Sequence, residues 1–525
     1  MTNIIKNILI IIVLGFLIYG FSLSNNFVWD DEEQIINNQA IHSIANFPKF
    51  FQGSTFNSGG SNSLTGLYYK PLMTSGFSII YSLFGPNPFF FHLLSLIFHI
   101  GNSILIFLIF LRFFPNPIAL FCSLIFLIHP INTEAVVYIS SLQEVMFLFF
   151  GLISFYLFLK KKMPIFVGIF FLLSLLSKET AIGFFFLIPS YLILEKIINK
   201  KWEFYNNKIL LYYFSFLTIY FFLRIKIAGI LFQNHNLTPI SKIEFYERLI
   251  SIPKIIFFYL QNFFYPINLG ISQHWVVTTF DFQNFWKPLL IVIGFFLLLI
   301  AGFIYLLKKK NKKIMVYIFF FLWFLIGIGM HLQIISLDMT VADRWFYFPI
   351  IGLLGMIGVI LLEIKNKKTI LIIGIIIVFL FSTRSFIRTL DWKNGLTLYS
   401  KDIITVVGSF DLENNLGVEL YRNGDYKNAK IHFEKSTKIA PFWWTNWNNL
   451  GVSFENEKNF SKAVDCYQKA IDNGQYFLAY ENMAKTLVFY GKDREKTEKF
   501  LQTALKLFPI NNTLIQLNTL HQQSN

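Results

Sequence analysis

Four acidic residues stand side by side early in the chain. Asp30, Asp31, Glu32 and Glu33 follow shortly after a hydrophobic N-terminal stretch. Adjacent carboxylates repel one another, which raises the pKa of at least one of them unless a cation or metal lies between them. A carboxylate at the border between water and lipid is suited to act as general base on a hydroxyl nucleophile. The alternative is a solvated acidic helix start, since Asp is common at N-caps.

Further charged residues interrupt the later hydrophobic stretches. His129 and Glu134 lie in the motif HPINTE, and Lys178 and Glu179 lie in the motif SKET. Charged groups at membrane depth are costly, so a functional role is the first hypothesis for them. Lys178 is a candidate for binding an anion. The alternative is an ion pair between Lys178 and Glu179 that satisfies both charges.

A third motif, DRWFYFP, begins with Asp343 and Arg344. The planar guanidinium group of arginine holds phosphate groups with several donors at once. Aromatic residues follow Arg344 at the level of the lipid. This combination predicts that Arg344 recognises a lipid-linked phosphate. The alternative is an arginine at a helix end whose charged head extends towards water.

The elements that must position these residues are membrane helices. Of the 525 residues 55% are hydrophobic and 14% are charged, whereas soluble proteins carry about 25% charged residues. This composition excludes a soluble enzyme for most of the chain. A spanning helix needs about 20 mostly apolar residues. We expect eleven spanning helices, and we expect the first of them to stay in the protein rather than to be cleaved off as a signal peptide. Two further apolar stretches, at 71–86 and 249–265, are expected to lie at the membrane interface. The eleven are expected at 4–23, 88–112, 116–130, 144–160, 163–177, 178–196, 208–225, 286–307, 313–331, 343–363 and 368–385.

The basic residues predict the orientation of these helices. Four basic clusters, at 160–162, 196–208, 308–313 and 365–368, fall on one side when eleven helices are counted. Lysine and arginine accumulate in cytoplasmic loops, so this side and the N-terminus are predicted to be cytoplasmic. An odd number of helices then places the C-terminal part outside. The candidate residues described above fall on that same outer side.

Charge and cysteine content exclude two further classes of protein. The net charge is +15, and its basic excess lies in the hydrophobic part of the chain. No soluble basic face appears, so nucleic-acid binding is not expected. Cys122 and Cys466 are the two cysteines, and this content does not suit a disulfide framework or a cysteine metal site.

Residues 386–525 form a polar segment with an internal repeat. Leu416-Gly417 recurs as Leu450-Gly451, and Phe433 aligns with Tyr467, each at a period of 34 residues. This period and the small residues are typical of tetratricopeptide repeats, here about three copies and a capping helix. Stacked repeats expose a concave groove that suits a peptide. The alternative is a spacer or a dimerisation module.

An aromatic run lies between the first two repeats. Trp443, Trp444 and Trp447 stand within five residues. The run is a candidate platform for binding the acceptor, as a peptide or a sugar. The alternative is a packed joint between neighbouring repeats.

Five motifs and the repeats occur in an order that resembles that of one family. The motifs are FVWDDE, YYKPL, HPINTEAV, LLSKET and ADRWFYFP. They are similar to the transmembrane and tetratricopeptide repeat-containing O-mannosyltransferases, and the chain resembles a bacterial relative of them. The resemblance implies an all-α fold of the GT-C class. Residues 1–385 would form the catalytic membrane domain, with the catalytic outer loop at 24–87, and residues 386–525 the repeat domain.

The resemblance also implies an activity. Such enzymes move a hexose, typically mannose, from a polyprenyl phosphate of the dolichyl-phosphate-mannose type to an acceptor with inversion. Asp30 matches the base, and Asp31 supports it or contacts the acceptor. Arg344 matches the residue for the donor phosphate, and Lys178 is its second candidate. Supporting residues are expected at Glu134, Glu179, Asp343 and His129. No metal is required, although the pair of aspartates leaves a divalent ion open.

Two other classes of function stay open. A lipid or sugar transporter would show related halves and helices broken at mid-membrane, and no internal symmetry is visible. A non-catalytic repeat scaffold for envelope assembly would not need acids, lysine and arginine gathered on one outer face. The repeats favour a protein acceptor with serine or threonine hydroxyls over a glycan or a lipid, and the expected location is a bacterial inner membrane.

Overall fold

The computed structural model describes residues 2–57, 64–65, 68–199, 204–231, 238–311 and 313–523. Parts of the expected outer loop 24–87 and of the basic clusters 196–208 and 308–313 lie outside the described residues. The expected all-α fold is confirmed. In the described ranges the strands are β1 (Phe56–Asn57) and β2 (Leu64–Thr65), which pair antiparallel.

Each of the eleven expected spans contains a helix. Seven helical segments are long and apolar enough to cross a membrane. Helix α4 (Asn116–Ile128) and the bent segment 130–137 that follows it would together form an eighth. The other three, α7, α13 and α14, are shorter apolar helices. The chain is therefore a multi-pass membrane protein. The helices are α1 (Thr2–Tyr19), α3 (Pro88–Phe110), α4 (Asn116–Ile128), α6 (Leu142–Leu159), α7 (Pro164–Ser177), α8 (Ile182–Asn199), α9 (Phe204–Phe222), α12 (Lys287–Lys308), α13 (Ile314–Gly329), α14 (Pro349–Glu363) and α15 (Lys367–Asp391).

The helices differ in how much of their surface other helices cover. In the most apolar part of the span that contains α6, 72% of the residues are buried inside the protein, whereas in the spans of α12 and α15 only 11% are. An exposed apolar surface of that extent is stable where lipid covers it. The centre of the bundle therefore lies around α6, and α12 and α15 belong to its lipid-facing rim.

Small residues let two of the short helices pack closely. A Cβ atom at Gly352 of α14 would lie 2.4 Å from the backbone nitrogen of Phe324 in α13, and one at Gly355 would meet the ring of Phe320 at 2.1 Å. Small residues of this kind allow helix backbones to approach in a membrane. The approach of α13 to α14 supports the short helix η10 (Asp343–Tyr347), which precedes α14.

The two interfacial stretches are also helices. They are α2 (Pro71–Phe84) and α11 (Phe245–Phe264), and both begin close to polar residues of the predicted outer side. The first of them starts with Pro71, which suits the first turn because proline has no N–H group to leave unpaired.

The repeat region follows α15 through α16 (Gly395–Thr405). It contains three helix pairs and a last helix. A Cβ atom at Gly417 would meet the ring of Phe433 at 2.6 Å, and one at Gly451 would meet Tyr467 at 2.5 Å. This contact explains why glycine recurs at this repeat position. The helices are α17 (Phe410–Arg422), α18 (Tyr426–Ile439), α19 (Trp444–Asn456), α20 (Phe460–Asn473), α21 (Phe477–Tyr490), α22 (Arg494–Leu507) and α23 (Asn512–Gln523).

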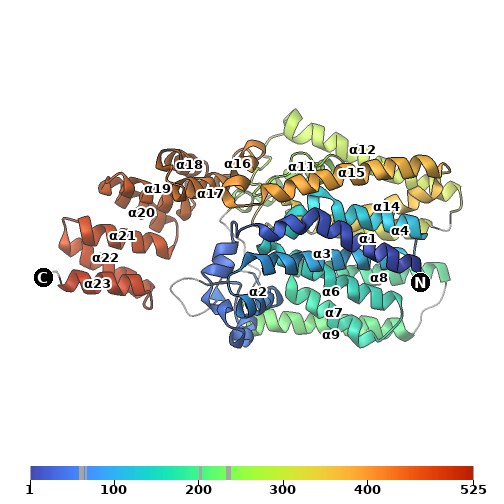
Figure 1. Ribbon diagram of the computed structural model, residues 1–525, viewed down its shortest axis with the longest axis horizontal. Helices are drawn as coiled ribbons and strands as arrows, with labels where there is room; N and C mark the ends of the chain where they lie inside the picture. The colour runs from blue at the N-terminus through green and yellow to red at the C-terminus, as the bar shows by residue number, and fades with distance from the viewer. Residues whose placement is uncertain are drawn as a thin grey trace.

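The repeat helices extend from one end of the membrane bundle. Figure 1 shows α17 to α23 in orange and red on the left, and the N-terminus of α1 at the opposite end on the right. The first loop and α2, in blue, lie at the end that carries the repeats. The candidate acidic loop and the repeat region therefore share one end of the molecule.

Candidate functional site

The acidic loop begins with a strained tryptophan. Trp29 has φ of 57°, a left-handed conformation that bulky residues rarely adopt. Its backbone N–H donates to the hydroxyl of Tyr399 in α16 at 3.0 Å, and its ring stacks on that of Tyr138 with centroids 5.3 Å apart. These two contacts hold the conformation. The strained turn sets the direction in which the next residue, Asp30, points.

Asp31 is fully buried and is fixed by hydrogen bonds. Its carboxylate accepts the backbone N–H of Val28 at 3.0 Å, and the backbone N–H and hydroxyl of Ser140 at 2.8 and 2.5 Å. Burial raises its pKa to about 7, although these hydrogen bonds lower it. Asp31 therefore joins the acidic loop to the short helix η6 (Ile139–Ser141). This burial fits a supporting role better than contact with an acceptor.

Asp30 is half-buried and therefore less enclosed than Asp31. One oxygen accepts the hydroxyl of Tyr138 at 2.9 Å. Loss of hydration raises the pKa of Asp30 to about 6, while the Tyr138 hydrogen bond and the charge of Arg344 oppose this rise. A base is most effective when its pKa lies near the working pH. Asp30 therefore has the properties of a general base at neutral pH.

Arg344 lies against the same aromatic residues. The carbon at the centre of its guanidinium group is 5.9 Å from the ring of Trp29 and 5.9 Å from that of Tyr138. Glu134 accepts the backbone N–H of Arg344 at 3.0 Å and one guanidinium N–H. Arg344 and Asp30 thus meet at Tyr138, a residue that the sequence motifs did not single out.

Two of the expected supporting residues form contacts elsewhere in the bundle. Asp343 is buried and accepts the amide of Asn262 in α11 at 3.1 Å. The Nδ1 atom of His129 accepts the N–H of Ile131, so its Nε2 carries the proton and donates to the carbonyl of Phe263 at 3.0 Å. Both residues tie neighbouring segments to α11, and no contact with Asp30 is present in the described ranges.

The SKET motif forms two separate ion pairs. Lys178 binds Glu144 of α6, and Glu179 accepts the guanidinium group of Arg224 at 2.5 Å. Glu144 and Arg224 are almost completely buried. The alternative of an ion pair between Lys178 and Glu179 is therefore not what the structure shows, because the partner of each comes from another helix.

A further group of residues lies close to this cluster. Tyr68 donates its hydroxyl to Asp338 at 2.8 Å, and the ammonium group of Lys70 lies 4.3 Å from the centre of the Tyr68 ring. The charge of Asp338 contributes to the raised pKa of Asp30. Lys70 lies in the motif YYKPL, although the sequence did not single it out, and nothing in the sequence marked Asp338.

Charged contacts connect the site to the repeat region. Arg422 of α17 makes two hydrogen bonds to Glu32, of 2.8 and 2.7 Å. Arg388 at the end of α15 makes two hydrogen bonds to Asp402 of α16, of 2.6 and 2.7 Å. Asp402 also accepts the N–H of Ile271, at 2.9 Å, from the loop after α11. The first repeat helices are therefore part of the wall next to the acidic loop.

The tryptophans of the repeat region lie in joints between helices. Trp443 meets the ring of Phe410 at 5.0 Å, and a Cβ atom at Gly474 would lie 2.4 Å from the ring of Trp444. Trp447 donates its ring N–H to the carbonyl of Pro441 at 2.8 Å. These contacts favour the alternative of a joint between repeats, and none of the three lies against a residue of the acidic loop in the described part.

Among the described residues no three histidine, cysteine, aspartate or glutamate side chains converge in a way that could hold a metal ion. Asp31 already receives hydrogen bonds at both carboxylate oxygens, from Val28 and Ser140. An ionised carboxylate has about four acceptor positions, so these bonds do not use all of those of Asp31. A divalent ion that bridges Asp30 and Asp31 stays a hypothesis from the sequence.

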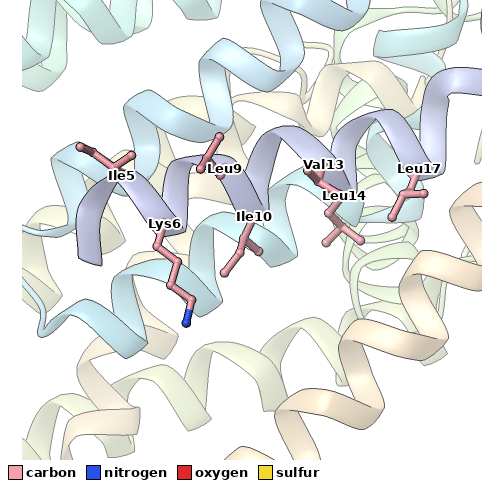
Figure 2. A pocket seen from close by; sticks show the side chains of 7 residues that line it. All are labelled: Ile5, Lys6, Leu9, Ile10, Val13, Leu14 and Leu17. Atoms are coloured by element: carbon pink, nitrogen blue, oxygen red, sulfur yellow. The ribbon is translucent and has the colours of Figure 1, made fainter. Parts of the chain in front are cut away.

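A hydrophobic groove of about 570 Å³ lies along α1, away from these residues. Figure 2 shows its lining side chains along α1, with the amino group of Lys6 extending beyond the apolar ones. Apart from this lysine the lining is apolar, as expected of a surface that faces lipid. The groove lacks the acids and bases that catalysis needs. It is lined by Ile5, Lys6, Leu9, Ile10, Val13, Leu14 and Leu17.

The chain is similar to a repeat family in its C-terminal part and to several protein O-mannosyl-transferases. Residues 414–442 and 445–473 match the family described as tetratricopeptide repeat. A protein O-mannosyl-transferase of Caenorhabditis elegans, F38B6.6, is 25% identical over 462 residues, which are 83% of this chain and 63% of that relative.

Two human proteins match shorter segments. The protein O-mannosyl-transferase TMTC3 is 31% identical over 165 residues, which are 31% of this chain and 18% of that protein. The protein O-mannosyl-transferase TMTC1 is 32% identical over 142 residues, which are 26% of this chain and 16% of that protein. The chain thus spans less than two thirds of the length of these relatives.

Proposed function

The homologues of this chain confirm its resemblance to protein O-mannosyl-transferases of the TMTC type, and from this we propose that it is a membrane glycosyltransferase. The reaction moves a hexose, mannose by analogy with the names of the relatives, from a polyprenyl phosphate to an acceptor hydroxyl. The observation that carries the proposal is the meeting of Asp30 and Arg344 at Tyr138. It puts a general base and a phosphate-binding cation within reach of one small substrate.

In the proposed reaction Asp30 removes the proton from the acceptor hydroxyl. The hydroxyl oxygen then attacks the anomeric carbon of the sugar, and the bond between this carbon and the phosphate oxygen breaks. Attack from the face opposite the leaving phosphate inverts the anomeric configuration. The bonding electrons leave with the polyprenyl phosphate, whose added negative charge a nearby cation stabilises.

Arg344 keeps donors for the phosphate in spite of its ion pair. A guanidinium group has five N–H donors. In the described ranges Glu134 engages one side-chain donor of Arg344, together with its backbone N–H. Glu134 therefore orients the guanidinium group and leaves other donors open. Lys178 acts less directly in this scheme, because Glu144 already neutralises it.

The proposed orientation puts this chemistry outside the cytoplasm. The N-terminus and the repeat region lie at opposite ends of the molecule (Figure 1). The basic clusters of the loops support a cytoplasmic N-terminus. The acidic loop and the repeats then face the extracytoplasmic side, where a lipid-linked sugar and a secreted acceptor meet.

The repeats supply a binding face for a protein acceptor. The amide of Asn449 in α19 donates to Asn414 in α17 at 2.9 Å, and Asn482 in α21 donates to Asn448 at 3.0 Å. The first helices of successive repeats thus carry a row of side-chain amides. Asn414 and Asn448 are buried, whereas Asn449 and Asn482 are half-buried. The amides of the latter two would pair with the backbone of an extended peptide, because each offers both a donor and an acceptor.

A small hollow of about 160 Å³ lies on the same face and includes Arg422, which also binds Glu32. A peptide on this row would therefore lead towards the acidic loop. The proposed acceptor is a serine or threonine hydroxyl of such a peptide. The hollow is lined by Val418, Tyr421, Arg422, Phe433, Asn449 and Val452.

The test uses membranes that contain the full chain and radiolabelled polyprenyl-phosphate mannose or glucose. Replacing a general base costs about 10²- to 10⁴-fold in rate, so Asp30→Asn should lose sugar transfer to this extent. Arg344→Ala should also lose transfer. The matched control is Glu33→Gln, since Glu33 is exposed on the same loop and accepts a hydrogen bond from the amide of Asn37 at 2.9 Å.

Unchanged transfer in a correctly folded Asp30→Asn protein would refute the proposal. Movement of the lipid-linked sugar across a vesicle membrane, without transfer, would instead support a transporter. Loss of function on deletion of the repeats alone, with Asp30→Asn harmless, would support a scaffold.

A further inference from the structure

The cations around the site differ in whether a carboxylate neutralises them. Arg344 is paired with Glu134, and Lys178 is paired with Glu144. Arg224 is paired with Glu179 in the same way. A cation that is already paired gains less from a new anion, since its charge is partly compensated.

Lys70 is the exception in this group. It precedes Pro71 at the start of α2, and it is half-buried. In the part of the chain that the structure describes, no carboxylate lies within ion-pair distance of its ammonium group. The ammonium group instead lies over the face of the Tyr68 ring, 4.3 Å from its centre. A ring face compensates a desolvated ammonium group only in part, because the attraction is weaker than that of a close anion.

The charged groups that face Lys70 come from several elements. Glu179, Asp338 and Glu144 act on it from beyond contact distance, and Lys178 adds a repelling positive charge. Burial and Lys178 lower the pKa of Lys70, and the three acids raise it, with burial as the largest cause. An anion placed between Lys70 and Lys178 would relieve both the desolvation and the repulsion.

We propose that Lys70 binds the phosphate group of the polyprenyl-phosphate sugar, with its ammonium group donating to a non-bridging phosphate oxygen. This inference rests on the proposed function and assigns the donor phosphate to a second residue beside Arg344. Lysine is an effective phosphate ligand because it presents a compact charge with three donors. The first turn of α2 adds backbone N–H groups that have no partner inside the helix.

The charge of the phosphate explains why a free cation is useful here. In the donor the phosphate is a diester with one negative charge. When its bond to the sugar breaks, the phosphate becomes a monoester and carries a second negative charge. Lys70 therefore interacts more strongly with the leaving group than with the donor, and such an interaction accelerates the chemical step.

The experiment measures binding of a polyprenyl monophosphate to the full chain in detergent, by displacement of a fluorescent analogue. Lys70→Met should weaken this binding at least about 10-fold, in line with the loss of one charge-assisted contact of about 1.5–3 kcal/mol. Lys70→Arg should retain most of the affinity because it keeps the charge. Lys49→Met is the matched control, since Lys49 is an exposed lysine of the same outer loop.

The ligands in the assay separate phosphate recognition from lipid binding. The polyprenol without phosphate should bind more weakly and equally to the wild type and Lys70→Met. Inorganic phosphate should compete with the monophosphate in the wild type if the head group alone is recognised. If Lys70→Met and Lys70→Gln both bind the monophosphate with wild-type affinity, the assignment of Lys70 is wrong.

The Asp30→Asn variant separates this inference from the proposed function. It should bind the monophosphate normally while it transfers no sugar. Sugar transfer that needs Asp30 but is unaffected by Lys70→Met would overturn the role of Lys70 and leave the proposed function intact. If the wild-type chain transfers no sugar but its binding of the monophosphate depends on Lys70, this result would support the phosphate site and refute the glycosyltransferase.

Discussion

At the scale of residues, Asp30 and Asp31 are neighbours with different environments. Asp31 is fully buried and uses both carboxylate oxygens to hold the acidic loop on Ser140. The carboxylate of Asp30 accepts a single hydrogen bond in the described ranges, from Tyr138, and the residue stays half-buried. One aspartate therefore positions the loop, and the other is the proposed general base.

The pKa of Asp30 leads to a pH dependence of the reaction. In the proposed reaction Asp30 is the base and must be ionised, and burial raises its pKa to about 6. Sugar transfer at saturating donor should therefore fall about tenfold per pH unit below pH 6 and level off above about pH 7. The hydrogen bond from Tyr138 lowers this pKa, so Tyr138→Phe should move the midpoint to higher pH.

Initial rates of transfer between about pH 4.5 and 8 provide the measurement. Glu33→Gln is the control and should leave the midpoint where it is. A midpoint near pH 4 in the wild type would mean that Asp30 is hydrated and does not lie in a buried environment.

At the scale of elements, the end of α15 is fixed to α16 by a buried ion pair. Arg388 and Asp402 are both almost completely buried, and Asp402 also accepts the N–H of Ile271. Because α16 leads directly into α17, this pair sets where the first repeat lies. Tyr399 of the same α16 receives the N–H of Trp29, so the pair also supports the acidic loop.

Breaking this pair should destabilise the protein. Asp402→Asn leaves the guanidinium group of Arg388 buried without its main partner, which costs about 3–5 kcal/mol. We expect a clear drop in the melting temperature of the detergent-solubilised chain, together with loss of transfer. Asp391→Asn is the matched control, since Asp391 contacts Arg388 at the longer distance of 3.5 Å and is less buried.

The Asp391→Asn protein should melt close to the wild type. Equal melting temperatures for the Asp402→Asn protein and the wild type would show that water or another anion replaces Asp402, and that the pair does not set the position of α16.

At the scale of the whole molecule, the repeat array and the membrane bundle meet at the acidic loop. The salt bridge between Arg422 and Glu32 crosses this boundary, and both side chains are well exposed. Exposed pairs contribute about 0–1 kcal/mol, so this one orients the repeats more than it stabilises them. The row of asparagines on the first helices of the repeats continues from this point.

The row of asparagines predicts a change in acceptor affinity alone. Asn449→Ala with Asn482→Ala should raise the KM for a peptide acceptor several-fold, because two amides that would bind its backbone are lost. The KM for the lipid-linked donor should stay unchanged, since the proposed donor site lies in the bundle. Steady-state kinetics with each substrate varied in turn provide the measurement.

Asn473→Ala serves as the control for this row, because Asn473 is exposed on the second helix of its repeat. If the double variant raises the donor KM or leaves the acceptor KM at the wild-type value, the repeats do not deliver the acceptor through this row.

The sequence by itself determined the membrane helices and the repeat region. Apolar length sets whether a segment enters a membrane, and all eleven expected stretches contain helices. The 34-residue period of Gly417 and Gly451 follows from local packing against Phe433 and Tyr467. Both properties depend on neighbours along the chain, so the sequence suffices to predict them.

The tertiary structure alone decided which charges are paired. Lys178 binds Glu144 rather than the adjacent Glu179, and Lys70 is left with an aromatic ring. Asp30 and Arg344 are 314 positions apart by their numbers and meet at Tyr138, which no motif marked. An ion pair forms where two helices bring opposite charges together within a few ångströms, and sequence spacing does not fix how distant helices face one another.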